Sequence, residues 1–132
     1  MLYCLDTNII IDLFRNDLNV KRKLEELEQQ QVTFCLNPIV LCELWQGAYL
    51  APQQKNPKDL IIKFLETITM LDFTGESCHK FGEIYADLQK KGKQTQEPDL
   101  MIASICIAHN AILVTRNNKD FANIKGLKFV VW

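Results

Sequence analysis

Four acidic residues of this 132-residue chain stand where an apolar stretch is interrupted or where a strand is expected to end. Asp6 breaks the apolar opening MLYCLDTNII, and Glu43 is the only charged residue of PIVLCELWQGAYL. Asp99 is the only formal charge of DLMIASICIAHNAILVT, and Asp120 lies in TRNNKDF. A carboxylate buried in such surroundings must be paired, protonated or bound to a metal, because burying an unpaired charge costs several kcal/mol.

Each of these residues also has a purely structural explanation. Asp6 and Asp99 stand at expected helix starts, where a carboxylate accepts hydrogen bonds from backbone N–H groups and is favoured by the helix dipole. Glu43 could lie on a narrow exposed stripe of an amphipathic helix, and Asp120 could belong to an ordinary turn or short helix. Taken one at a time, the four positions do not establish a site.

The four positions together favour a shared site over coincidence. Clustered carboxylates repel one another and raise one another's pKa unless a cation neutralises them. Hard oxygen ligands without a neighbouring Cys or His suit Mg²⁺, or Mn²⁺, better than Zn²⁺. We therefore expect Asp6, Glu43 and Asp99 to be metal ligands. Asp120 is expected to complete the catalytic set.

Strand-like and helix-like stretches alternate along the chain, and they determine where these side chains lie. Strands are indicated by short apolar runs, and helices by apolar residues at helical spacing with caps and first-turn prolines. Strands are predicted at 2–5, 33–36, 70–73, 112–115 and 128–131. Helices are predicted at 8–15, 21–31, 38–49, 58–67, 77–91 and 99–110, with polar loops at 52–57 and 93–98.

This alternation predicts a single α/β domain over residues 1–132. Strand-to-strand connections through helices favour right-handed crossovers and a mainly parallel central β-sheet flanked by helices on both faces. In such sheets ligands bind beyond the carboxyl ends of the strands. Asp6 directly follows the first predicted strand, so the fold places it at that edge.

The charge balance and the cysteines of the chain indicate how it could bind a nucleic acid and in which compartment it acts. The chain has 15 Lys and Arg against 16 Asp and Glu, so binding of a nucleic acid would depend on local basic patches rather than on net charge. Five cysteines without a CxxC pair, mostly in apolar runs, indicate a reducing, cytoplasmic setting. Neither a secretion leader nor a membrane-spanning segment is predicted.

The order and spacing of four motifs resemble those of PIN-domain ribonucleases, and within them the VapC-type toxins of toxin–antitoxin pairs. The motifs are LDTNIIIDL at 5–13, NPIVLCELWQGA at 37–48, DLMIAS at 99–104 and LVTRNNKDFANIKGLKFVVW at 113–132. The resemblance covers the whole chain and implies a PIN-like fold whose acidic pocket holds one or two divalent metals and cuts RNA.

The resemblance also implies roles for particular residues. Asp6, Glu43 and Asp99 match the three main acidic positions of the family, and either Asp120 or Asn117 matches the fourth. Supporting polar residues that match the pocket are Thr7, Asn8, Thr115 and Asn117. Residues expected to contact RNA phosphates, because of their charge, are Arg116, Lys91 and Lys93.

Partners follow from the same resemblance. The expected substrate is structured RNA, transfer RNA and in particular initiator transfer RNA. The expected protein partners are a second copy of the chain and a separate antitoxin that also binds operator DNA and forms a hetero-oligomer with the toxin. Two alternatives stay open: a catalytically degenerate binding module of the same fold, and a haloacid-dehalogenase-type phosphotransfer enzyme. The latter normally has a second Asp where this chain has Asn8.

Overall fold

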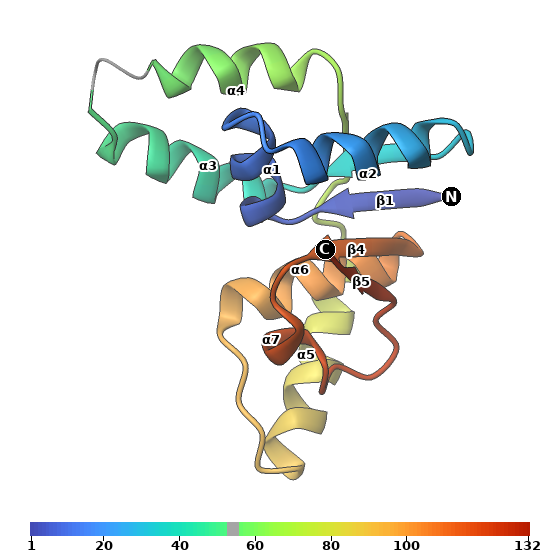
Figure 1. Cartoon of the computed structure of the whole chain (residues 1–132). Helices are drawn as coiled ribbons and strands as arrows, with labels where there is room; N and C mark the ends of the chain where they lie inside the picture. The colour runs from blue at the N-terminus through green and yellow to red at the C-terminus, as the bar shows by residue number, and fades with distance from the viewer. Residues whose placement is uncertain (53–55) are drawn as a thin grey trace.

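Five short parallel strands form one sheet in the computed structural model, which describes residues 1–52 and 56–132. The strands lie in the order β3-β2-β1-β4-β5, so the N-terminal strand is central (Figure 1). Their bounds are β1 Leu2–Leu5, β2 Thr33–Leu36, β3 Thr69–Met70, β4 Ala111–Thr115 and β5 Phe129–Val131. All four strand pairs are parallel, which confirms the predicted α/β class.

Within the described residues, seven helices connect and flank the strands. They are α1 Thr7–Phe14, α2 Leu18–Glu28, α3 Pro38–Leu50, α4 Pro57–Leu65, α5 Gly75–Lys90, α6 Glu97–Ala108 and α7 Asn118–Phe121. In Figure 1 the helices α1 to α4 lie on one side of β1, and α5, α6 and α7 lie on the other. Of the helices within the described residues, none is long and apolar enough to cross a bilayer.

Helix α6 supplies much of the core, as its apolar sequence predicts. Its residues Leu100 and Ile102 to Cys106 are buried, and α5 packs along it. The hydroxyl of Ser104, the polar member of this run, donates to the carbonyl oxygen of Leu100 over 2.6 Å, so its burial is compensated. The buried residues of this helix hold its first turn, which includes Asp99, in place.

Several element boundaries differ from the predicted ones because caps set them. Helix α2 begins at Leu18, not at 21, because the Asp17 side chain accepts hydrogen bonds from the N–H groups of Asn19 and Val20. Helix α5 begins at Gly75, not at 77, because Thr74 and Ser77 form a reciprocal capping box. Helix α6 begins at Glu97, not at 99, because Glu97 and Pro98, which were predicted as loop, belong to its first turn.

Two further differences concern short elements. The strand predicted at 70–73 is reduced to Thr69–Met70, and the chain then turns toward the cap of α5. Helix α7 was not predicted, because four residues are too few to show a helical period. The loop predicted at 52–57 falls partly outside the described residues, at 53–55.

Candidate functional site

Asp6 lies between β1 and α1, and both of its carboxylate oxygens accept hydrogen bonds. Oδ1 accepts from the Thr7 N–H over 2.8 Å, which makes Asp6 the N-cap of α1. Oδ2 accepts from the Thr115 hydroxyl over 2.6 Å, at the end of the neighbouring strand β4. The helix-cap explanation for Asp6 is therefore correct, and the same side chain also faces the carboxyl ends of two strands.

Glu43 reaches the same edge from the middle of α3. The direction of α3 is set by Asn37, whose Oδ1 accepts from the N–H groups of Ile39 and Val40 over 3.0 Å. Glu43 Oε1 accepts a hydrogen bond from the Thr7 hydroxyl over 2.8 Å. Burial raises the pKa of Glu43, the Thr7 bond opposes that rise, and the charge of Asp6 adds to it. Glu43 is thus half-buried, and it faces Asp6 across Thr7.

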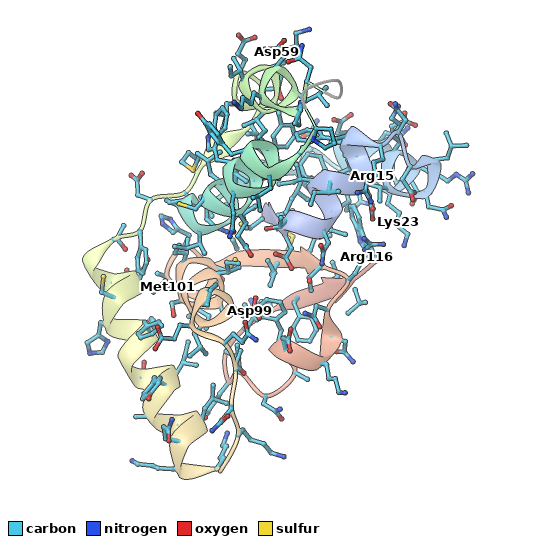
Figure 2. All side chains as sticks on the ribbon, turned by 90° about the vertical axis from the view of Figure 1, so that its left-hand side faces the viewer. Arg15, Lys23, Asp59, Asp99, Met101 and Arg116 are labelled. Atoms are coloured by element: carbon cyan, nitrogen blue, oxygen red, sulfur yellow. The ribbon has the colours of Figure 1, made fainter. Side chains whose placement is uncertain are left out.

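Asp99 and Asp120 face each other from the first turn of α6 and from α7. Burial raises the pKa of Asp99 to about 6. The charges of the other three carboxylates, Asp120, Asp6 and Glu43, contribute to this rise. Figure 2, viewed onto the edge where β1 ends, shows Asp99 near the centre of that face. Four carboxylates from four separate segments therefore lie within electrostatic reach of one another.

The polar residues at the end of β4 and directly after it support these carboxylates. Besides binding Asp6, the Thr115 hydroxyl accepts from the Asn117 N–H over 3.0 Å. The Asn117 side-chain amide donates to Asp120 Oδ2. Asp120 thus faces Asp99, while Asn117 holds Asp120 in place. Asn8, also predicted to line the site, is exposed on α1.

The basic residues predicted to contact RNA have acidic neighbours. Arg116 forms an ion pair with Asp12 of α1, with Nη2 3.1 Å from Oδ2, and its side chain is 49% exposed. Lys91 pairs with Asp87 over 2.9 Å, and exposed Lys93 lines a surface hollow together with Asp120. Sequence reasoning missed Asp12, although its position in the otherwise uncharged helix TNIIIDLF is a signal of the kind that revealed Glu43.

An apolar groove adjoins Glu43. Helices α1, α3 and α4 line it with Ile11, Leu44, Ala48, Leu60 and Ile61 among others, and Arg15 and Glu43 supply charge at its wall. The groove therefore combines an apolar floor with an acidic group of the carboxylate set.

The donor set fits Mg²⁺ by its chemistry. Within residues 1–52 and 56–132, no three Asp, Glu, His or Cys side chains form a ready-made ligand cluster. Mg²⁺ does not need one, because it keeps several waters and binds through one or two carboxylates. The raised pKa values of Glu43 and Asp99 show uncompensated repulsion and burial that a divalent cation would relieve.

The chain matches known proteins over almost its whole length. A family model described as PIN domain matches residues 3–127. Ribonuclease VapC2 of Rickettsia felis is 33% identical over 132 residues, which cover 100% of this chain and 98% of that protein. The tRNA(fMet)-specific endonuclease VapC of Shigella flexneri is 29% identical over 130 residues, which cover 98% and 97%. The match to each relative runs nearly from end to end.

A solved structure gives the same fold. The crystal structure of VapBC2 from Rickettsia felis, bound to a DNA fragment from their promoter, matches with a TM-score of 0.91 and 32% identity. The match covers 100% of this chain and 99% of that one. The two chains therefore share one fold over nearly their full lengths.

Proposed function

This chain belongs to the PIN-domain family, among its VapC-type ribonucleases, and we propose that it is the Mg²⁺-dependent endoribonuclease toxin of a toxin–antitoxin pair. The observation that carries the proposal is the convergence of Asp6, Glu43, Asp99 and Asp120 on one edge of the sheet. Mn²⁺ is the expected substitute for Mg²⁺, because both take hard oxygen ligands.

The proposed mechanism assigns roles to the residues of the site. Asp6, Glu43 and Asp99 would hold Mg²⁺, which supplies positive charge against the negative charge that develops on a phosphodiester during hydrolysis. Thr115 orients the Asp6 carboxylate through its 2.6 Å hydrogen bond. Thr7 orients Glu43 in the same way. These hydroxyls fix the ligands before the substrate arrives, so little reorganisation is needed during reaction.

Transfer RNA is the proposed substrate, with initiator transfer RNA as the specific candidate. Support comes from the relative of Shigella flexneri, which is named a tRNA(fMet)-specific endonuclease. Arg116, directly after the Asp6-binding residue Thr115, would contact a phosphate near the cleaved bond. We place this activity in the cytoplasm, where transfer RNA is used in translation.

An antitoxin that also binds operator DNA is the proposed protein partner, in complexes that contain a toxin homodimer. Support comes from the solved relative VapBC2, which is bound to a promoter DNA fragment. The apolar groove beside Glu43 suits an amphipathic segment of such a partner, since its floor is aliphatic and its wall carries a carboxylate.

The test is cleavage of transfer RNA by the purified protein with Mg²⁺ and with a chelator. We expect cleavage with Mg²⁺ only, and growth arrest when the chain is expressed alone in bacteria. Asp6→Asn, Glu43→Gln and Asp99→Asn should each abolish both effects, because each removes a charge and nearly preserves shape. Tight RNA binding without cleavage under any metal would instead favour a catalytically degenerate binding module.

A further inference from the structure

A tryptophan and a lysine lie together near the residue that binds Asp6. The backbone N–H of Trp132 donates to the carbonyl oxygen of Thr115 over 3.0 Å, which places the backbone of Trp132 beside the residue that binds Asp6. Lys23 of α2 holds its Nζ 5.8 Å from the centre of the Trp132 ring. An aromatic ring, partly buried against the core, and a cation thus lie together near the point where β4 and β5 end.

Two arginines continue this surface toward α1. Arg116 follows Thr115 and is held by Asp12, and Arg15 is exposed one helical turn after Asp12. In Figure 2 the labelled side chains of Arg15, Lys23 and Arg116 lie along one flank of the face that has Asp99 near its centre. We call Arg15, Lys23, Arg116 and Trp132 the basic flank.

The charge around the site is uneven. The basic flank brings three cations to one side of the site, and of these Arg116 is paired with Asp12. On the opposite side, Lys91 is paired with Asp87, and Lys93 shares its surface hollow with Glu97 and Asp120. A polyanion that approaches the acidic site is therefore attracted on the α1–α2 side more than on the α5–α6 side.

From this arrangement, and on the basis of the proposed ribonuclease function, we propose that the basic flank binds the RNA strand where it leaves the carboxylate site. Its phosphates contact Arg116, Lys23 and Arg15, and an unpaired base stacks on the Trp132 indole. Single-stranded RNA is held in this way by proteins that combine cations with an aromatic ring, because every base has a face that can stack.

Binding of a single-stranded RNA oligonucleotide, measured by fluorescence anisotropy in chelator so that no cleavage occurs, tests the cations. Lys23→Gln and Arg15→Gln should each weaken binding several-fold and reduce the slope of log K against log salt by about 0.7. The matched control is Lys58→Gln, because Lys58 Nζ also lies over an aromatic ring, 3.9 Å from the centre of Tyr49. Arg116 is replaced together with its partner, as Asp12→Asn with Arg116→Gln, so that no charge is left unpaired.

Tryptophan fluorescence tests the stacking. The chain has two tryptophans, so Trp45→Phe leaves Trp132 as the sole reporter. RNA should quench this signal, and Trp132→Ala should weaken binding about tenfold while Trp132→Phe, which keeps a ring, retains most of it. If the variant with Trp45→Phe binds RNA without any change in fluorescence, stacking on Trp132 is excluded.

The outcomes separate this inference from the proposed function. Wild-type cleavage of RNA with undiminished binding by Lys23→Gln and Arg15→Gln would overturn the basic flank alone. A loss of binding in Lys93→Gln instead would place the strand on the opposite side and also overturn it. A wild-type protein that neither binds nor cuts RNA would overturn both proposals.

Discussion

The hydroxyl of Thr7 donates a hydrogen bond to Oε1 of Glu43 across 2.8 Å and thereby joins the start of α1 to the middle of α3. The N–H of the same residue donates to Asp6 over 2.8 Å. One residue therefore fixes two carboxylates of the site, one through its backbone and one through its side chain. A substitution that removes only the Thr7 hydroxyl therefore removes the bond to Glu43 and keeps the backbone bond to Asp6.

Thr7→Val should lower the rate of RNA cleavage about tenfold, because a hydrogen bond to a charged group contributes roughly 1.5–3 kcal/mol. The Thr7 bond lowers the pKa of Glu43, so its loss should also move the acid limb of the pH–rate profile to higher pH. Thr7→Ser retains the hydroxyl and is the control. An acid limb at the same pH in wild type and Thr7→Val would show that Glu43 does not determine it.

Asp120 and Asn117 should differ in their effect on cleavage. Asp120→Asn removes a charge that faces Asp99 and is expected to reduce the rate at least a hundredfold, as a catalytic group would. Asn117→Ala only frees Asp120 from one hydrogen bond and should cost about tenfold. Asn118→Ala, at an exposed position of α7, is the control in the same kinetic assay. Equal rates for Asp120→Asn and wild type would leave Asn117 as the better candidate for the fourth position.

Much of the site could be predicted because its carboxylates disturb otherwise regular patterns. Glu43 stands alone in an apolar helix, and Asp99 lies in the first turn of a helix whose middle is buried. The parallel sheet followed from the alternation of elements, and parallel strands place their carboxyl ends at one edge. The convergence of separate segments was therefore accessible to sequence reasoning.

The features that the sequence did not reveal depend on contacts between distant segments or on very short elements. The ion pair of Asp12 and Arg116 joins residues 104 positions apart, and no local pattern reveals such a pair. Helix α7 has four residues, yet it sets the position of Asp120. Trp132 directly follows the strand predicted at 128–131, and only the strand register places its backbone beside Thr115.

The stability of the metal-free protein should depend on pH through Asp99. In the folded state its pKa is about 6 instead of 3.8, so between these values the folded protein holds a proton that the unfolded chain has lost. The unfolded state then binds fewer protons, and the free energy of unfolding falls as pH rises from about 4 to about 6. We expect the melting temperature of wild type, relative to that of Asp99→Asn, to fall over this interval in chelator. A constant difference between the two proteins would contradict the raised pKa.

The pair of Asp12 and Arg116 should contribute to stability through burial of the carboxylate. The Asp12 side chain is only 10% exposed, so Arg116→Gln leaves a nearly buried charge without its cation. We expect a loss of about 1–3 kcal/mol in the free energy of unfolding, measured by urea denaturation. Adding Asp12→Asn to Arg116→Gln should recover most of that loss, because the charge is then removed. If the double variant is no more stable than Arg116→Gln, the two side chains are not coupled.

Binding of Mg²⁺ should be detectable without any RNA, because it relieves repulsion among the four carboxylates. An ion that binds only the folded state raises its stability by RT ln(1 + [Mg²⁺]/Kd), about 2.7 kcal/mol at a concentration one hundred times Kd. The melting temperature of wild type should therefore rise with Mg²⁺ concentration.

In chelator, Asp99→Asn should be as stable as wild type or more stable, since burial and neighbouring charges raise the pKa of Asp99. The same variant should show a smaller rise with Mg²⁺. If Asp99 only stabilised the start of α6, Asn would replace it with little loss and the Mg²⁺ response would be unchanged. Melting curves of the two proteins, with chelator and with increasing Mg²⁺, distinguish a metal ligand from a residue that only stabilises a helix end.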